Sequence, residues 1–124
     1  MNLGKPDRCL AQLAPTPEYF DGIVHMQPLV SAATSQELEL VAVFFDAGAR
    51  TIPHTHSTDQ VLWVVEGQCV VADETGRRIL GPGECAFLPA ERWHWHGAAP
   101  GGPACHVSIR RPGPTNWDVA RRDW

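Results

Sequence analysis

The sequence Gly48-Ala-Arg-Thr-Ile-Pro-His54-Thr-His56-Ser-Thr-Asp-Gln60 places three potential metal ligands within seven residues. If residues 52–56 are extended, their side chains alternate between two faces, so His54 and His56 project from the same side of the strand. Gln60 follows after a short turn and offers an amide oxygen as a third donor. The neighbouring Asp59 has the opposite parity and is a weaker candidate. The stretch therefore predicts most of a metal site.

A second segment carries the donor that the first one lacks. Residues 83–94, with the sequence GECAFLPAERWH, end in His94. His96 follows two residues later, so the two side chains share a face of any strand formed there. A small antiparallel barrel brings non-adjacent strands within reach of one ligand, so His94 can face the first segment across its interior. We predict that one divalent ion is bound by His54, His56, Gln60 and His94.

The spacing of these residues resembles the two motifs of the cupin family. The first motif matches as Gly48, five residues, His54, one residue, His56, three residues, Gln60, six residues and Gly67. The second matches as Gly83, five residues, Pro89, four residues and His94, and fifteen residues separate the two motifs. The chain departs from the usual pattern at Gln60, where cupins mostly carry Glu, and at Glu91, where they mostly carry Gly. The resemblance implies a double-stranded β-helix, or jelly-roll barrel, with a bound metal ion.

Composition independently favours an all-β fold. The 124 residues include eleven Gly and eleven Pro, which separate short apolar runs and suit turns and strands better than long helices. A chain of this length has room for one domain with a single core. We predict strands over residues 22–31, 37–46, 60–66, 68–73, 77–80, 85–88, 93–97 and 105–110. The predicted barrel spans residues 22–112, between an N-terminal arm (1–21) that drapes over the barrel or a neighbouring subunit and a C-terminal tail (113–124).

Charge and hydropathy exclude several classes of partner. Ten basic and fourteen acidic residues give a net charge of −4, so nothing draws the chain to nucleic acid or to anionic membranes. No apolar run reaches the roughly eighteen residues of a transmembrane helix, and we see no secretory signal at the N-terminus. We therefore expect a cytoplasmic protein. The four cysteines are far apart in sequence, which favours buried, reduced thiols over a zinc cluster or disulfides.

Strand parity also predicts an interface. Trp63, Trp93 and Trp95 lie on the strand faces opposite to the expected ligands. Aromatic side chains on the outside of a barrel must be covered by the second sheet or by another subunit, because exposed aromatic clusters usually mark an interface. We predict a homodimer.

The predicted ligands define the chemistry of the ion. Three imidazoles and one amide are neutral, so the ion would keep its full divalent charge and act as a stronger Lewis acid than with Glu at position 60. Nitrogen and oxygen ligands without a thiolate suit Mn, Fe, Ni, Co or Zn. The resemblance to cupins favours Mn(II) or Fe(II).

Two further histidines indicate acid–base chemistry. His96 shares the face of His94 but is displaced along the strand, which we expect to place it nearer the mouth of the barrel, where a neutral imidazole could act as general base. His106 lies on the last predicted strand. Together with Gln60, the sequence His-Trp-His-Gly-Ala at 94–98 and the tail Asn-Trp-Asp-Val at 116–119, these residues resemble small bacterial cupins that act as manganese-dependent hydroxynitrile lyases.

That resemblance implies a reaction. A cyanohydrin hydroxyl would bind the metal, His96 would remove its proton, and cleavage of the carbon–carbon bond would release cyanide and an aldehyde, with His106 contacting the nitrile. An apolar wall for an aromatic substrate would come from three residues that share one parity on a buried strand, Val41, Val43 and Phe45. Arg110 shares the parity of His106, where the lyases tend to carry Gln. An inward Arg110 would favour an anionic substrate, and an outward one would lie in water.

Three classes of function follow from these residues. The first is a metal-dependent lyase of the hydroxynitrile lyase type. The second is a metal-dependent dioxygenase that acts on an enolate or carboxylate, and the third is a non-catalytic protein that binds a small ligand. His96 and His106 favour acid–base catalysis over simple binding, whereas Arg110 favours an acidic substrate.

Overall fold

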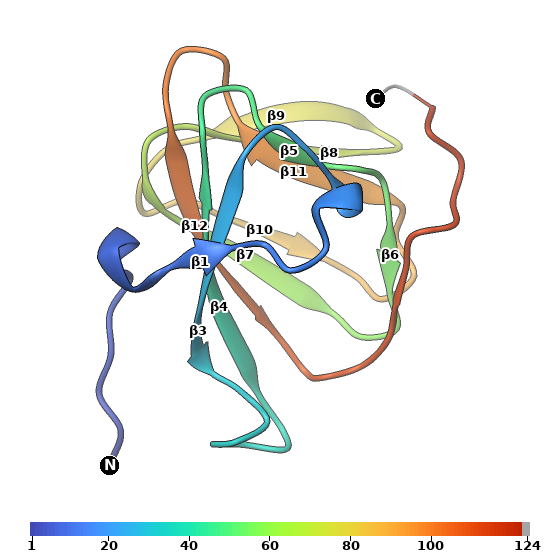
Figure 1. The fold of residues 1–124 in the computed structure, drawn as a ribbon. Coiled ribbons are helices and arrows are strands. Elements are labelled where there is room, and N and C mark those ends of the chain that lie inside the picture. The colour runs from blue at the N-terminus through green and yellow to red at the C-terminus, as the bar shows by residue number, and fades with distance from the viewer. Residues whose placement is uncertain (123–124) are drawn as a thin grey trace.

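The computed structural model describes residues 1–122, which form two β-sheets that close into a barrel (Figure 1). In spatial order, the six-stranded sheet contains β1 (Gln12–Leu13), β3 (Val24–Val30), β4 (Glu39–Phe45), β12 (Ala104–Arg110), β7 (Gln60–Glu66) and β10 (Cys85–Leu88). The five-stranded sheet contains β2 (Phe20–Asp21), β5 (Arg50–Thr51), β11 (His94–Ala98), β8 (Cys69–Asp73) and β9 (Gly76–Leu80). A separate antiparallel pair is formed by β6 (Thr55–His56) and β13 (Thr115–Asn116).

The all-β prediction is confirmed. Within residues 1–122 the helical elements are two 3-10 turns, η1 (Arg8–Leu10) and η2 (Pro17–Tyr19). Every predicted strand is present, with bounds that agree within two residues. The strands that the sequence did not predict are each two residues long, too short to show a period. They are β1, β2, β5, β6 within the extended segment at 52–56, and β13.

Alternation along the strands sets the two faces of the barrel wall. In β7 the side chains of Gln60, Leu62 and Val64 are buried, whereas Trp63 and Val65 are exposed. This is the period of two expected for a strand with one face on a core. The parity that places Gln60 inside the barrel and Trp63 outside is therefore correct.

Strand register orders the interior from an apolar end to a polar end. On β4 and β12 the inward pairs run from Phe45–Ala104 through Val43–His106 and Val41–Ser108 to Glu39–Arg110. Arg110 is in turn opposite Gln60 on β7. The apolar end belongs to a cluster of buried side chains that includes Val24, Val43, Phe45, Val64 and Cys69. Burying each of the larger ones stabilises the fold by about 1.5–3 kcal/mol, and this end holds the barrel closed around the polar end.

Two of the three outward tryptophans, Trp93 and Trp95, form a buried cluster with Ala72 that the chain itself covers, so they leave no exposed aromatic patch. Trp95 is 3% exposed and lies beneath the guanidinium groups of Arg50 and Arg77, at 5.0 and 4.9 Å from the ring. Trp93 is covered by the C-terminal tail, and its Nε1 donates to the carbonyl of Ala120 at 2.6 Å. This covering depends on long-range contacts and could not be predicted from strand parity.

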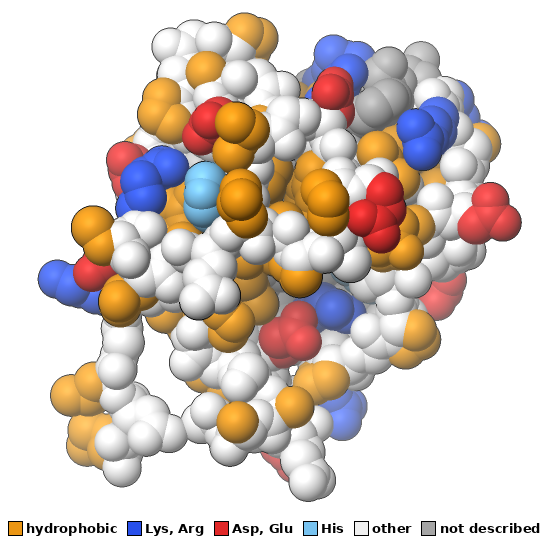
Figure 2. Space-filling view, viewed as in Figure 1, with side chains coloured by type: hydrophobic (Ala, Val, Ile, Leu, Met, Phe, Trp, Pro, Cys, Tyr) orange, Lys and Arg blue, Asp and Glu red, His pale blue; other side chains and the backbone are white. Residues whose placement is uncertain are grey.

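Exposed apolar side chains nevertheless remain on the outer surface. Trp63 on β7 is 46% exposed, and Phe87 on the edge strand β10 is 62% exposed. Figure 2 shows further hydrophobic side chains, interspersed with charged ones, on the face where β1 lies in front. The homodimer stays a prediction, which the molar mass in solution would test.

Both terminal segments contact the barrel. Residues 12–13 pair with β3 as an edge strand, and residues 20–21 pair with β5. The backbone N–H of Asp7 donates to Gln27 Oε1 at 2.8 Å, which fastens the beginning of the chain to β3. At the other end, residues 115–116 pair with β6. No helix among residues 1–122 is long and apolar enough to cross a membrane.

Candidate metal centre

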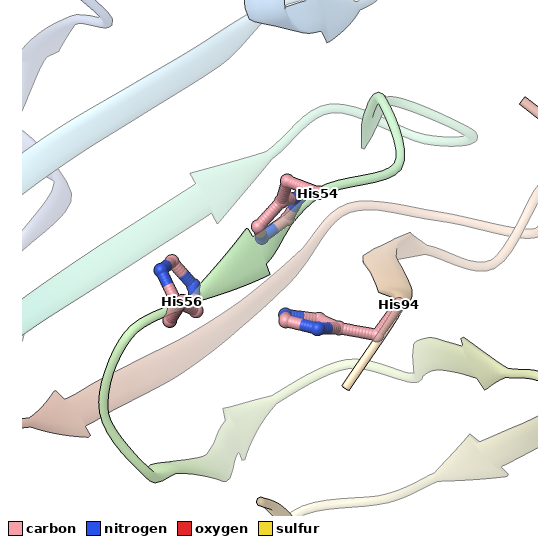
Figure 3. Close-up of side chains that lie close together, drawn as sticks. All are labelled: His54, His56 and His94. Carbon is pink, nitrogen blue, oxygen red and sulfur yellow. The ribbon is translucent and has the colours of Figure 1, made fainter. Parts of the chain in front are cut away.

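Three histidines converge at the polar end of the barrel. His54 and His56 come from the segment of β6, and His94 is the first residue of β11 in the five-stranded sheet. The rings therefore meet from two distant parts of the chain (Figure 3). One ligand nitrogen from each lies within 4.8 Å of the others, and all three side chains are buried. Two backbone hydrogen bonds, His54 N–H to His94 O at 3.0 Å and the reverse at 3.1 Å, hold the two segments together.

A glycine allows β11 to approach the neighbouring strand. At Gly97 a Cβ atom would collide with the carbonyl of Ala49 and with Arg50 on the adjoining segment. The strand that carries His94 and His96 therefore lies closer to β5 than any residue with a side chain would permit.

Gln60 completes the cluster. Its Oε1 lies 3.2 Å from Nε2 of His94, and its Nε2 donates to Ser108 Oγ at 2.8 Å. The bond to Ser108 uses the amide N–H, so the amide oxygen faces the histidines. Asp59 instead accepts a hydrogen bond from the backbone N–H of Ala90 at the surface. The position that faces the cluster is therefore Gln60, as strand parity predicts.

Backbone carbonyls set the tautomers of two histidines. Nδ1 of His54 lies 2.8 Å from the carbonyl of Ile52, and Nδ1 of His94 lies 2.8 Å from that of Arg92. A carbonyl only accepts, so each Nδ1 carries the proton and each Nε2 presents a lone pair to the cluster. In His56, Nδ1 bonds to Thr115 Oγ1 at 2.9 Å, and Nε2 is buried without a hydrogen-bond partner.

Burial keeps these rings neutral. It lowers the pKa of His54 well below its ordinary value, and the nearby His94 and His56 lower it further. Burial, with Arg110 and His94, lowers the pKa of His56 to about 3, and burial lowers that of His94 to about 4. The cluster thus presents lone pairs from three neutral imidazoles and one amide oxygen.

This donor set fits a metal ion. In the absence of a cation, an amide facing imidazole lone pairs would turn its NH2 group toward them, because an N–H donor there would satisfy both partners. Gln60 instead presents its oxygen. Three histidines that could bind a divalent transition metal therefore lie together, with an oxygen donor beside them, and nitrogen and oxygen ligands suit Mn, Fe, Co, Ni or Zn.

His96 and His106 form a second pair behind this cluster. His106 Nε2 and His96 Nδ1 are 2.9 Å apart and share one proton. His106 is fully buried opposite Val43, and His96 is 5% exposed. Strand register places His96 opposite Val71, between His94 and the apolar end at Ala98, so it lies on the inner side of the metal centre. The prediction that placed it nearer the mouth was wrong. Burial lowers the pKa of His96 well below its ordinary value and that of His106 to about 4, so both are neutral.

A cavity of about 130 Å³ opens beside the cluster. Val41, Val43 and Met26 supply apolar wall, and His54, His56, Gln60 and His96 supply the polar side. Phe45, which was predicted to line the wall, is 0% exposed and packs behind it against the rings of His96 and His106 at 6.0 and 5.3 Å. His106 does not reach the cavity either, because His96 lies between.

Arg110 points inward and lines the cavity. Its Nε lies 3.3 Å from Glu39 Oε1, and its Nη1 donates to the carbonyl of Gly113 at 3.1 Å. The guanidinium is therefore already neutralised by a carboxylate on the neighbouring strand.

Comparison with known proteins decides the family. The family described as "Cupin domain" matches residues 41–109, which hold both ligand-bearing segments. The chain belongs to the cupin family. It is 38% identical over 96 residues to an (R)-mandelonitrile lyase from Granulicella tundricola, a match that covers 75% of this chain and 72% of the relative.

Solved cupin structures agree with the fold. A cupin-like protein from Thermotoga maritima is 31% identical, with a TM-score of 0.77, over 86% of this chain and 84% of its own. The polyketide cyclase RemF from Streptomyces resistomycificus has the same TM-score, 0.77, over 98% of this chain and 89% of its own. It is only 19% identical, so that likeness shows the fold alone.

Several residues of this cupin site were not found from the sequence, among them Met26 of the cavity wall. Ser108 holds Gln60, and it could have been found, since it has the inward parity of its strand neighbours. Glu39 neutralises Arg110, and strand pairing alone gives that contact. Thr115 and Trp117 contact the histidines from the tail, where no period indicates which side chains point inward.

The buried histidines of this cupin make the metal-free protein sensitive to acid. Their folded-state pKa values lie below the value of about 6.5 that applies in the unfolded chain, so below pH 6.5 the unfolded state binds more protons. Each of the five can lower the free energy of unfolding by up to about 1.4 kcal/mol per pH unit. Full stability is present above pH 6.5 and falls as the pH approaches 4. Thermal melts of chelator-treated protein should show a steep loss of Tm between pH 6.5 and 5, and a flat profile would contradict the buried neutral cluster.

Proposed function

We propose that this cupin is a metal-dependent lyase of the hydroxynitrile lyase type, which cleaves or forms the carbon–carbon bond of a cyanohydrin. The observation that carries the proposal is His96, a neutral imidazole at the wall of the cavity whose other nitrogen bonds to a buried histidine. Its ring centroid is 5.4 Å from that of His54. A base is therefore placed next to the site where a metal would hold the reacting oxygen. The similarity to an (R)-mandelonitrile lyase supports this reaction.

His54, His56, His94 and Gln60 would hold the ion, for which we propose Mn(II) or Fe(II). The bound ion would supply a Lewis acid that polarises a substrate oxygen and makes its hydroxyl more acidic. None of the four ligands carries a charge, so they would leave the ion's charge undiminished. Ser108 keeps the oxygen of Gln60 directed at the site through its hydrogen bond to the amide nitrogen.

His96 performs the proton transfer. When the shared proton is on its Nδ1, its Nε2 has a lone pair that can accept the proton of the substrate hydroxyl. The oxygen then forms the carbonyl, the bond to the nitrile carbon breaks, and its electron pair leaves with cyanide. The imidazolium returns the proton to cyanide, so the products are an aldehyde and hydrogen cyanide. Phe45, packed against both rings, fixes the orientation of the histidine pair.

The cavity favours a small neutral substrate. Its volume of about 130 Å³ corresponds to on the order of ten water-sized atoms, about the size of a phenyl-substituted cyanohydrin. The charge of Arg110 is already paired with Glu39, so a substrate carboxylate would gain less from it than from an unpaired arginine. The ion pair therefore supports a cyanohydrin over the enolate or carboxylate of an oxygenase.

An anaerobic assay tests the proposal. Protein loaded with Mn(II) or Fe(II) is mixed with racemic mandelonitrile without oxygen, and released cyanide and benzaldehyde are measured against a metal-free sample. We expect metal-dependent release with a preference for one enantiomer. Activity that appears only with oxygen would indicate an oxygenase instead. Binding of mandelonitrile without turnover would indicate a ligand-binding protein.

The neutral ligand set gives a prediction at Gln60. Gln60→Glu places a carboxylate against the ion, so we expect metal affinity to rise and turnover to fall, each by about one order of magnitude, or ~1.4 kcal/mol. Ser108 can donate its hydroxyl proton to the new carboxylate. Isothermal titration with Mn²⁺ and the cyanide assay measure the two effects.

Gln27→Glu is the matched control for Gln60→Glu. Gln27 is another buried glutamine with its own hydrogen bonds, to Asp7 and Lys5, and it lies outside the cavity. It should lose stability through the buried charge without any change in metal affinity. Unchanged turnover in a metal-bound Gln60→Glu protein would contradict the importance of a neutral ligand.

A further inference from the structure

The C-terminal tail, which we define as residues 113–122, reaches the metal centre with one hydrogen-bonding side chain. Thr115 Oγ1 lies 2.9 Å from Nδ1 of His56. For Nε2 of His56 to bind a metal, the proton of the neutral ring must be on Nδ1, which then donates to the threonine oxygen. Thr115 therefore supplies the acceptor that the metal-binding tautomer of His56 needs.

His56 differs in this respect from the other two ligands. His54 and His94 each bond to the carbonyl two residues before them, within their own segment of chain. For His56 that carbonyl belongs to His54, and it already accepts the N–H of His94 in the bridge between the two segments. The support for the third ligand comes instead from a segment 59 residues away in sequence.

A second side chain of the tail covers the site. Trp117 packs on His54 with ring centroids 4.4 Å apart, and it lines the cavity. It also stacks on Tyr19 of η2, at 4.3 Å with an angle of 2° between the rings, and lies 6.4 Å from the ring of Phe20. The N-terminal and C-terminal segments thus meet through one aromatic stack directly over a metal ligand.

Backbone contacts fix the tail in register. Thr115 is paired with His56 and Asn116 with Thr55, and Ser57 N–H donates to the carbonyl of Pro114 at 3.3 Å. Gly113 lies against Ser57, whose hydroxyl would have to move if residue 113 carried a Cβ. The position of Thr115 against His56 is therefore specified by strand pairing.

We propose that Thr115 is a positioning residue of the metal centre and that tail docking and metal binding are thermodynamically coupled. The inference rests on the metal centre of the proposed function. When the tail is docked, the Nδ1 proton of the metal-binding tautomer has an acceptor in Thr115 Oγ1, so metal binds more tightly. By reciprocity, bound metal stabilises the docked tail by the same factor. Without the threonine oxygen, a buried N–H at Nδ1 would lack an acceptor, and the ring would favour the tautomer whose Nε2 cannot bind an ion.

Titration of four proteins with Mn²⁺ and with Zn²⁺ tests the coupling. Thr115→Val keeps the shape of the side chain and removes the acceptor, so its affinity should fall about 10–100-fold, as for other residues that support metal ligands. Thr115→Ser keeps the oxygen and should bind within a fewfold of the wild type. The control is Thr34→Val, because Thr34 is exposed in the turn between β3 and β4 and belongs to neither the tail nor the metal centre. It should bind metal as the wild type does.

Amide hydrogen exchange supplies a readout that does not depend on activity. Saturating Mn²⁺ or Zn²⁺ should slow exchange in peptides covering residues 113–119 of the wild type by about tenfold or more, and by much less in Thr115→Val. Equal affinities for wild type and Thr115→Val, equal losses in Thr115→Val and Thr34→Val, or tail exchange unaffected by metal would each overturn the coupling. If neither ion binds the wild type, the metal centre itself is wrong, and both proposals fall.

Discussion

Replacing His54 with alanine should remove tight metal binding from a protein that stays folded. A four-ligand site of about 10–16 kcal/mol provides about 3 kcal/mol per ligand, so the loss of one imidazole should weaken binding by two to three orders of magnitude. The fold should survive because the apolar clusters lie elsewhere in the barrel. The imidazole of His54 packs between His94 and Trp117, so its removal also leaves a cavity. Metal content after dialysis and a titration with Mn²⁺ measure the effect.

The control for His54→Ala is His25→Ala. His25 is the one of the six histidines that lies outside the site. It belongs to β3 and has no ring contact with the cluster. This variant should keep its metal. Circular dichroism of both variants separates loss of the ion from unfolding. Full metal content in folded His54→Ala would contradict the assignment of His54 as a ligand.

Replacing His96 with alanine should lower kcat and kcat/KM together by about 10²–10⁴ while the metal stays bound. This is the range that a general base contributes, and a parallel loss in both constants marks an interaction made only in the transition state. The metal should remain because His96 is not one of the three histidines whose ligand atoms converge. Cyanide release from mandelonitrile and metal analysis of the same sample test both parts.

His106→Ala is the informative companion to His96→Ala. His106 reaches His96 but not the cavity, so its removal should change the pH profile of turnover more than it changes substrate binding. The substitution would leave Nδ1 of His96 without its hydrogen-bond partner, so the proton of the His96 ring could lie on either nitrogen. Unchanged turnover in metal-bound His96→Ala would show that another group is the base.

The fold and most of the candidate site could be predicted from the sequence because both depend on short-range patterns. The strands were predicted from alternation in residues 60–66 and from Gly and Pro between the apolar runs. The parity of Gln60 predicted that its side chain points into the barrel. Motif spacing alone predicted that His54, His56 and His94 lie together. These inferences need only the period of a strand and the turns between strands.

Depth along the barrel could not be predicted in the same way. Phe45 has the parity of Val41, but four residues of strand separate them by roughly 13 Å. Val41 lines the cavity, whereas Phe45 lies in the core. His106 and His96 were misplaced for the same reason, since parity gives the face of a side chain and not its level. The covering of Trp93 and the support of His56 by the tail depend on contacts across most of the chain.

The two backbone hydrogen bonds between His54 and His94 would make the proposed metal ligands unequal in rigidity. His54 and His94 would keep a fixed separation, whereas His56 could adjust its position. Their backbones are bonded to each other in both directions, so the separation of these two donors is set by the fold. His56 belongs to a two-residue strand whose partner is also two residues long. A change in ionic radius would therefore be absorbed on the side of His56. Crystals grown with Mn²⁺ and with Zn²⁺ should differ at His56 and residues 113–117, while His54 and His94 superpose; such tolerance would leave the choice of ion to its abundance in the cell.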